Sequence, residues 1–210
     1  MTAKLSVLRK GYRFDVAERS QEVAEFCAGR VSPRGGAFAW PESADGFEPP
    51  AAGRYDVVSC FFRLEGLREA DRTALVAEMT RWLKPGGRLL IAYVSARSYH
   101  GLTEKLRARR GGPKGVEYVL SPDPNIGPFE PLRPGAVQQL AKDAGLEITA
   151  RFGAQAAPPH EELDFRTRNM RPASGKILRG IAAMARAFEK IPGATSGRGR
   201  FQFLIARRPQ

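Results

Sequence analysis

The sequence contains few of the residues that build disulfide or metal sites. It holds two cysteines, Cys27 and Cys60, and two histidines among 210 residues. Two cysteines so far apart give neither a disulfide framework nor the spacing of a metal site. His160 is followed by Glu161 and Glu162, but no second histidine completes the H-E-x-x-H zinc motif. The sequence therefore predicts no metal centre.

Long apolar runs are also missing. No segment approaches the ~20 apolar residues of a membrane-spanning helix, and the amino terminus lacks the pattern of a secretory signal. The composition, 42% hydrophobic and 27% charged, is ordinary for a globular domain. We therefore expect a cytoplasmic protein in which residues 1–210 form one α/β domain with a buried core.

Acidic residues are outnumbered by basic ones, which gives a formal net charge of +12. Such an excess favours either an anionic partner, such as nucleic acid, acidic lipid or a phosphorylated substrate, or simply a solvated basic surface. Basic residues gather at 107–114 and 198–208, but neither segment carries a zinc finger or an aromatic RNA-binding motif. We prefer the solvated surface, and an RNA-binding or RNA-modifying role rests on charge alone.

The stretch from Tyr55 to Ser95 has the pattern of a strand, a helix and a second strand. An apolar run begins at Tyr55, and the apolar residues of one helical face follow it: Leu75, Val76, Met79, Trp82 and Leu83. Pro85-Gly86-Gly87 is expected to stop this helix, and residues 89–94 are a candidate second buried strand. Two such strands joined by one helix predict a right-handed βαβ crossover.

Weaker patterns predict the remaining elements. Ser20 is expected to cap a helix, and residues 154–172 are expected to form a loop because they contain several prolines. The other predicted strands are 12–17, 36–40, 146–152 and 201–206, and the other predicted helices are 134–145 and 177–188.

Three parts of the central stretch together resemble the class I S-adenosylmethionine-dependent methyltransferases. These are the aromatic-Asp-Val-Val strand at Tyr55, the Leu-x-x-Leu at 64–67, and Leu-Lys-Pro-Gly-Gly before an apolar strand. The resemblance covers the fourth strand, helix D and the fifth strand of that fold. It implies a Rossmann-like α/β fold whose mostly parallel sheet has an antiparallel last strand. It also implies S-adenosylmethionine as cofactor and methyl transfer to a small-molecule or lipid-like acceptor.

The resemblance breaks down at the amino terminus. The family has a first strand, a glycine-rich loop and a helix before its acidic strand end, whereas the residues before Glu18 contain one glycine, Gly11. The first βα unit is therefore predicted to be absent. The start could be truncated or misassigned, a partner chain or second copy could supply the strand, or the chain could be an inactive methyltransferase-like interaction subunit. Residues 4–8 are one candidate replacement strand.

The resemblance implies a cofactor site built from several loops. Glu18 matches the family's acidic residue, whose carboxylate accepts hydrogen bonds from both ribose hydroxyls. Glu42 and Ser43, with Asp45 as a further choice, follow the third strand, where the family contacts the adenine amino group. Cys60 and Phe61 occupy the loop that lines the cofactor.

The resemblance also implies where a substrate would bind. Residues 95–134 correspond to the segment that the family uses as a substrate cover, and long irregular connections are often functional. At Glu65 the family often carries histidine or another polar residue, but no obligatory base is evident, so the catalytic residue stays unassigned. The candidate substrate-binding residues are Phe62, Arg63, Tyr99 and His100.

Overall fold

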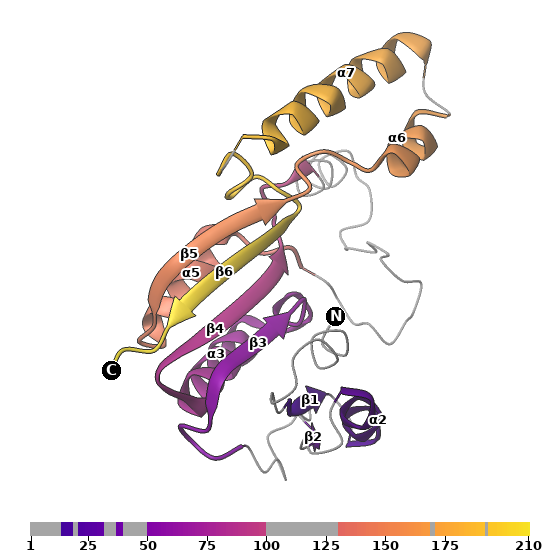
Figure 1. Cartoon of the computed structure of the whole chain (residues 1–210). Coiled ribbons are helices and arrows are strands. Elements are labelled where there is room, and N and C mark those ends of the chain that lie inside the picture. The colour runs from indigo at the N-terminus through magenta and orange to yellow at the C-terminus, as the bar shows by residue number, and fades with distance from the viewer. Residues whose placement is uncertain are drawn as a thin grey trace. The chain divides into compact units, whose positions relative to one another are not determined.

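The computed structural model of the chain separates into two compact units, Met1–Ala51 and Ala52–Gln210, which are described here one at a time (Figure 1). That residues 1–210 form a single domain stays a prediction. The residues that the structure describes are 14–18, 21–31, 37–39, 50–99, 130–168, 171–191 and 193–210.

The first unit contains a small parallel sheet. Strand β1 (Val16–Glu18) pairs with β2 (Ala37–Ala39), and helix α2 (Gln21–Val31) connects them along the chain. Glu22 in the first turn of α2 and Arg30 in its last turn complement the helix dipole. The predicted strand, helix and strand are confirmed as elements, but among the described residues the first strand covers Val16–Glu18 instead of 12–17. Ser20 and residues 4–8 lie outside the described residues.

A four-stranded sheet forms the centre of the second unit. Its order is β3 (Tyr55–Phe61), β4 (Leu83–Val94), β6 (Phe201–Arg207) and β5 (Glu147–Ala154). β3 pairs with β4 in parallel, and β6 is antiparallel to both of its neighbours. The predicted mixed sheet with an antiparallel last strand is confirmed.

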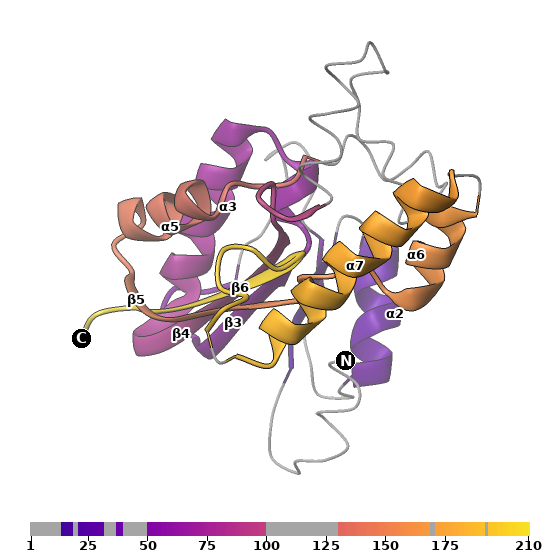
Figure 2. The same cartoon turned by 90° about the horizontal axis from the view of Figure 1, so that it is seen from above.

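Two helices cover one face of this sheet, α3 (Glu69–Trp82) and α5 (Pro134–Asp143), as Figure 2 shows. Pro134 stands in the first turn of α5, where proline costs no helical hydrogen bond. The predicted apolar face of α3 is buried. The core that it forms with the sheet and α5 includes Leu75, Val76, Met79, Leu89, Ile91, Val137 and Leu204.

Pro85-Gly86-Gly87 does not stop α3 as predicted. The helix ends at Trp82, and the chain enters β4 at once. Leu83 pairs with Tyr55 and Arg88 with Val57, so the proline and the glycines form a bulge inside the strand. Gly86 has a φ of 77°, which favours glycine. Its amide donates to the Arg208 carbonyl at 2.9 Å, which ties the bulge to the end of the chain.

The predicted loop at 154–172 is wrong, because it contains helix α6 (His160–Thr167). The next helix, α7 (Pro172–Glu189), also begins earlier than predicted. Pro159 precedes α6, and Pro172 stands in the first turn of α7. Prolines at these positions mark helix starts rather than loops.

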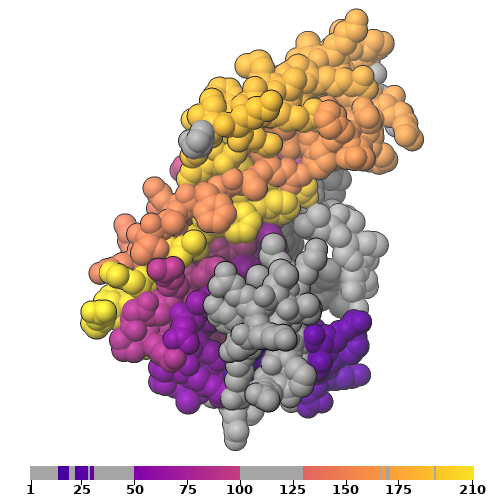
Figure 3. All heavy atoms as spheres, in the orientation of Figure 1, coloured from indigo at the N-terminus to yellow at the C-terminus, as the bar shows by residue number. Residues whose placement is uncertain are grey.

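Helix α7 carries a row of exposed apolar side chains along one face. Ile177, Ile181, Met184 and Phe188 are each at least half exposed, and Figure 3 shows the atoms of α7 at the surface. The end of α7 is fixed by Glu189, whose carboxylate accepts from the Ala157 amide at 3.0 Å. Among the described residues, no helix is long and apolar enough to cross a membrane.

Candidate functional site

The carboxyl ends of β3 and β4 meet at one edge of the sheet, where open α/β sheets bind ligands. The loop after β3 begins at Phe62, whose amide donates to the Ala92 carbonyl at 2.8 Å. Phe62 has a φ of 55°, which is strained for a bulky side chain and typical of functional loops. Its ring contacts Phe201 edge-on at 5.4 Å, so β6 holds the strained residue in place.

Glu65 lies buried behind this loop, in the short helix η1 (Leu64–Gly66), with 1% of its surface exposed. Its Oε1 accepts from the Val94 amide at 2.5 Å, at the end of β4. Its Oε2 has no hydrogen-bond partner among the described residues. Burial raises the pKa of Glu65 to about 7, against the opposing effects of the Val94 hydrogen bond and of Arg72. The carboxyl group therefore changes protonation near neutral pH.

Arg72 of α3 connects the short helix η1 to Glu130, which lies far along the chain. Its Nε donates to the Leu64 carbonyl at 2.8 Å, and its Nη2 forms an ion pair with Glu130 at 2.8 Å. The Glu130 amide in turn donates to the Glu65 carbonyl at 2.9 Å. The arginine side chain is only 12% exposed, so this pairing is partly shielded from solvent.

Both ends of the predicted substrate cover, residues 95–134, lie at the same edge. Ser95 and Leu132 form a parallel bridge directly beyond β4. The Leu132 amide donates to the Val94 carbonyl, and the Ala96 amide donates to the Leu132 carbonyl, each at 2.9 Å. Residues 100–129 lie outside the described residues, so the covering role stays a prediction.

The structure brings together the predicted residues at the end of β3, but Cys60 and Phe61 are the last two residues of the strand itself and not part of the loop. Cys60 is buried, and burial, together with the charge of Glu65, raises its pKa to about 12. Its thiol therefore stays protonated, which suits packing rather than nucleophilic chemistry. Phe61 is 43% exposed at the strand end and offers an apolar surface. Arg63 follows Phe62 and precedes the short helix η1 as its N-cap residue.

The other predicted site residues fall in different places. Glu18 is exposed at the carboxyl end of β1, in the first unit, whose position relative to the second is not determined. The Tyr99 hydroxyl donates to Glu162 Oε2 of α6 at 3.2 Å, so at least part of its role is structural. Glu42, Ser43 and His100 lie outside the described residues.

Sequence reasoning named Glu65 but assigned it no role. The available signal was a lone acidic residue between the two leucines of Leu-x-x-Leu. Its burial depends on the Val94 amide, which lies far along the chain. Among the described residues, no group of three or more His, Cys, Asp or Glu side chains could hold a metal ion.

Comparisons with known proteins agree with this geometry. Residues 3–91 match the model of a methyltransferase domain family. No curated protein matches the sequence.

Similar solved structures cover nearly the whole chain. A SAM-dependent methyltransferase of Methanosarcina mazei superposes with a TM-score of 0.56 at 16% identity, covering 98% of this chain and 86% of that one. A protein of Bacillus halodurans described as a methyltransferase gives a TM-score of 0.54 at 14% identity, covering 95% and 84%. One of Galdieria sulphuraria, described as a sarcosine dimethylglycine methyltransferase, gives 0.51 at 16% identity, covering 99% and 74%.

These likenesses, at such low identity, establish the fold, and the family match concerns the first part of the chain. They agree with the β3–α3–β4 unit and with the antiparallel β6 described above. The chain is therefore recognised as having the class I S-adenosylmethionine-dependent methyltransferase fold, with a methyltransferase domain match across residues 3–91.

Proposed function

We propose that this chain is a methyltransferase that transfers a methyl group from S-adenosylmethionine to a small-molecule or lipid-like acceptor. The family match and the fold imply this cofactor. The observation that carries the proposal is Glu65, which keeps one buried oxygen unpartnered at the carboxyl edge of the sheet. A buried polar atom without a partner costs about 1–3 kcal/mol. A bound group at this edge would account for that cost.

The residues at this edge fit such a cofactor. Phe61 supplies an exposed apolar ring beside buried Cys60, as a purine or thioether requires. We propose that Glu18 accepts hydrogen bonds from the ribose hydroxyls, and that Glu42 or Ser43 contacts the adenine. When bound, the cofactor supplies a methyl group activated by a positively charged sulfur.

The chain's own contribution to the reaction is positioning and proton transfer. Methyl transfer depends largely on the alignment of the two reacting groups, so it needs no invariant catalytic motif. We propose that Phe62, Arg63, Tyr99 and His100 orient the acceptor. Glu65 Oε2 is a candidate proton acceptor, because a carboxyl group with a pKa of about 7 can take up a proton near neutral pH.

Replacing Glu18 with alanine is expected to weaken S-adenosylmethionine binding at least ~10-fold. The variant would lose two hydrogen bonds to a charged acceptor, each worth about 1.5–3 kcal/mol. Calorimetric titration of wild type and variant measures this effect. Glu22→Ala on neighbouring α2 removes an equally exposed carboxylate and should leave the affinity within about 2-fold. Equal losses in both variants would refute the role of Glu18.

The alternative function is a catalytically inactive, methyltransferase-like interaction subunit. No observation on the described residues favours inactivity, and the titration above separates the two functions. A partner chain or second copy, and a location in the cytoplasm, belong to the proposal as well. A nucleic-acid substrate is disfavoured, because the basic segments carry no nucleic-acid-binding module.

A further inference from the structure

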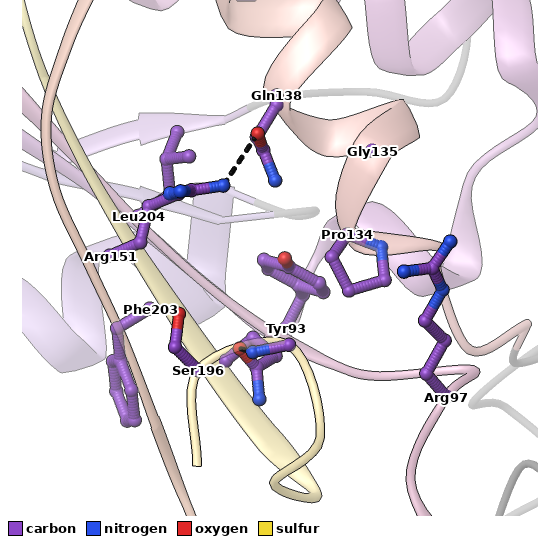
Figure 4. Close-up of a pocket in the computed structure, with 11 residues that line it drawn as sticks. Tyr93, Arg97, Pro134, Gly135, Gln138, Arg151, Ser196, Phe203 and Leu204 are labelled. Atoms are coloured by element: carbon purple, nitrogen blue, oxygen red, sulfur yellow. Dashed lines mark hydrogen bonds between the residues drawn. The ribbon is translucent and has the colours of Figure 1, made fainter. Parts of the chain in front are cut away.

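A cavity of about 280 Å³ opens on the helical face of the sheet between α5 and the strands β4, β5 and β6 (Figure 4). Its polar lining includes Tyr93, Arg97, Gln138, Arg151 and Ser196. Two of these side chains are cationic, and no aspartate or glutamate is among the described residues that line the cavity. The cavity is therefore a positively charged recess in a protein that is itself basic.

Tyr93 is the buried polar group of this cavity. Only 3% of the residue's surface is exposed, and it belongs to the cavity wall. Figure 4 shows the hydroxyl among the side chains that line the cavity, near Pro134 at the start of α5. Burial raises the pKa of Tyr93 to about 12, although the charge of Arg151 opposes the rise. The hydroxyl is therefore a hydrogen-bond donor at neutral pH.

The two arginines leave their charges available to a ligand. Arg151 Nη1 donates to Gln138 Oε1 at 2.8 Å, which orients the guanidinium beside α5. The ion pairs between described residues include neither Arg97 nor Arg151. Arginine binds carboxylate and phosphate groups with two parallel hydrogen bonds, and this geometry gives such sites their selectivity.

The amino terminus of α5 adds a further attraction for anions. The helix begins at Pro134, and Gly135 follows it in the cavity wall. Pro134 has no N–H, and the Ala136 and Val137 amides donate to the Arg133 carbonyl, so the start of α5 offers an anion the Gly135 amide and the helix dipole. A tyrosine, two arginines and a helix start thus line one cavity.

We propose that this cavity is a binding site for an oxyanion, a carboxylate or phosphate group, held by Tyr93, Arg97 and Arg151 at the start of α5. The cavity lies beside the carboxyl end of β4. Tyr93 in its wall directly precedes Val94, whose amide donates to Glu65. The oxyanion is therefore well placed to be the anionic end of the methyl acceptor. That last assignment rests on the proposed function, whereas the oxyanion site itself does not.

NMR titration of the ¹⁵N-labelled full chain tests the site. Inorganic phosphate and acetate are each added at an ionic strength held constant with chloride. We expect at least one of them to cause saturable shifts of the Gly135 amide and of the Arg97 and Arg151 Nε–H signals, and chloride alone to cause none. Saturable shifts caused by phosphate alone, or by acetate alone, would identify which oxyanion the site binds. Failure of both would overturn the proposal.

Variants distinguish anion binding at this cavity from nonspecific attraction of anions to a basic protein. Arg151→Gln and Tyr93→Phe are expected to weaken binding of the effective anion at least ~5-fold, because each removes one of the converging donors. Arg68→Gln makes the same charge change at a side chain that is 93% exposed, and it should leave binding unchanged. An equal loss in Arg68→Gln would overturn the proposal.

The same variants distinguish the two proposals from each other. Arg151→Gln should bind S-adenosylmethionine with unchanged affinity, because the cofactor is assigned to the end of β3. Retained cofactor binding without any anion binding would refute the oxyanion site and leave the proposed function standing. Anion binding by a folded chain that binds no cofactor would support the oxyanion site and refute the proposed function.

Discussion

Gly153→Ala is expected to destabilise the second unit by about 3 kcal/mol or more, at the upper end of overpacking effects. A Cβ at this position would lie 2.1 Å from the Thr195 carbonyl oxygen and 2.4 Å from Gln202 Nε2. The first contact is with backbone, which cannot rotate away. The Thr195 hydroxyl also donates to the Gly153 carbonyl at 2.6 Å, so the two segments are bonded where they would have to separate.

Urea denaturation measures this effect, and Gly180→Ala provides the matched control. Gly180 lies inside α7, and a Cβ there would meet no atom within 4 Å. Alanine is favoured over glycine in a helix by about 0.5–1 kcal/mol, so this variant should be slightly more stable than wild type. A loss of under about 1 kcal/mol in Gly153→Ala would contradict the close approach of β5 to the segment at Thr195.

The free energy of unfolding is expected to depend strongly on pH because of Glu65. Its pKa is about 7 in the folded chain, against 4.5 as the ordinary value. The folded state therefore holds the proton more tightly than the unfolded state. The resulting stabilisation is complete below pH 4.5 and is lost as the pH rises to about 7. At about 1.4 kcal/mol for each pKa unit, the loss amounts to about 3 kcal/mol.

Glu65→Gln isolates this contribution. Glutamine keeps an oxygen that can accept from the Val94 amide, but it does not titrate. We expect the free energy of unfolding of wild type to fall relative to this variant between pH 4.5 and 7. Urea denaturation at several pH values measures the difference, and Glu161→Gln at an exposed position of α6 is the control. A constant difference across this range would show that Glu65 is not buried as described.

The sequence was sufficient to predict the β3–α3–β4 unit, because its signals are local. The apolar face of α3 repeats with helical spacing, and the strand at Tyr55 is a short apolar run. The same local reasoning failed at Pro85-Gly86-Gly87, where the residues that stop a helix also suit a bulge. It failed again at 160–167, where prolines precede a helix instead of interrupting one.

The sites could be predicted only in part, because their decisive contacts are not local. The strand pattern predicts where β3 ends, so Cys60 and Phe61 could be placed at the edge of the sheet, although they belong to the strand and not to the loop. The burial of Glu65 requires the end of β4. The oxyanion cavity requires side chains from separate elements, such as Tyr93 of β4 and Arg151 of β5, which no spacing in the sequence brings together.

Hydrogen–deuterium exchange of the full chain, with and without S-adenosylhomocysteine, tests the proposed cofactor site. We expect saturating ligand to slow exchange in two separate segments. These are residues 58–66, which contain the end of β3 and Glu65, and the segment around Glu18, whereas the exposed α7 stays unchanged. A folded chain with no slowed exchange in either segment would contradict the assignment of this edge as the cofactor site.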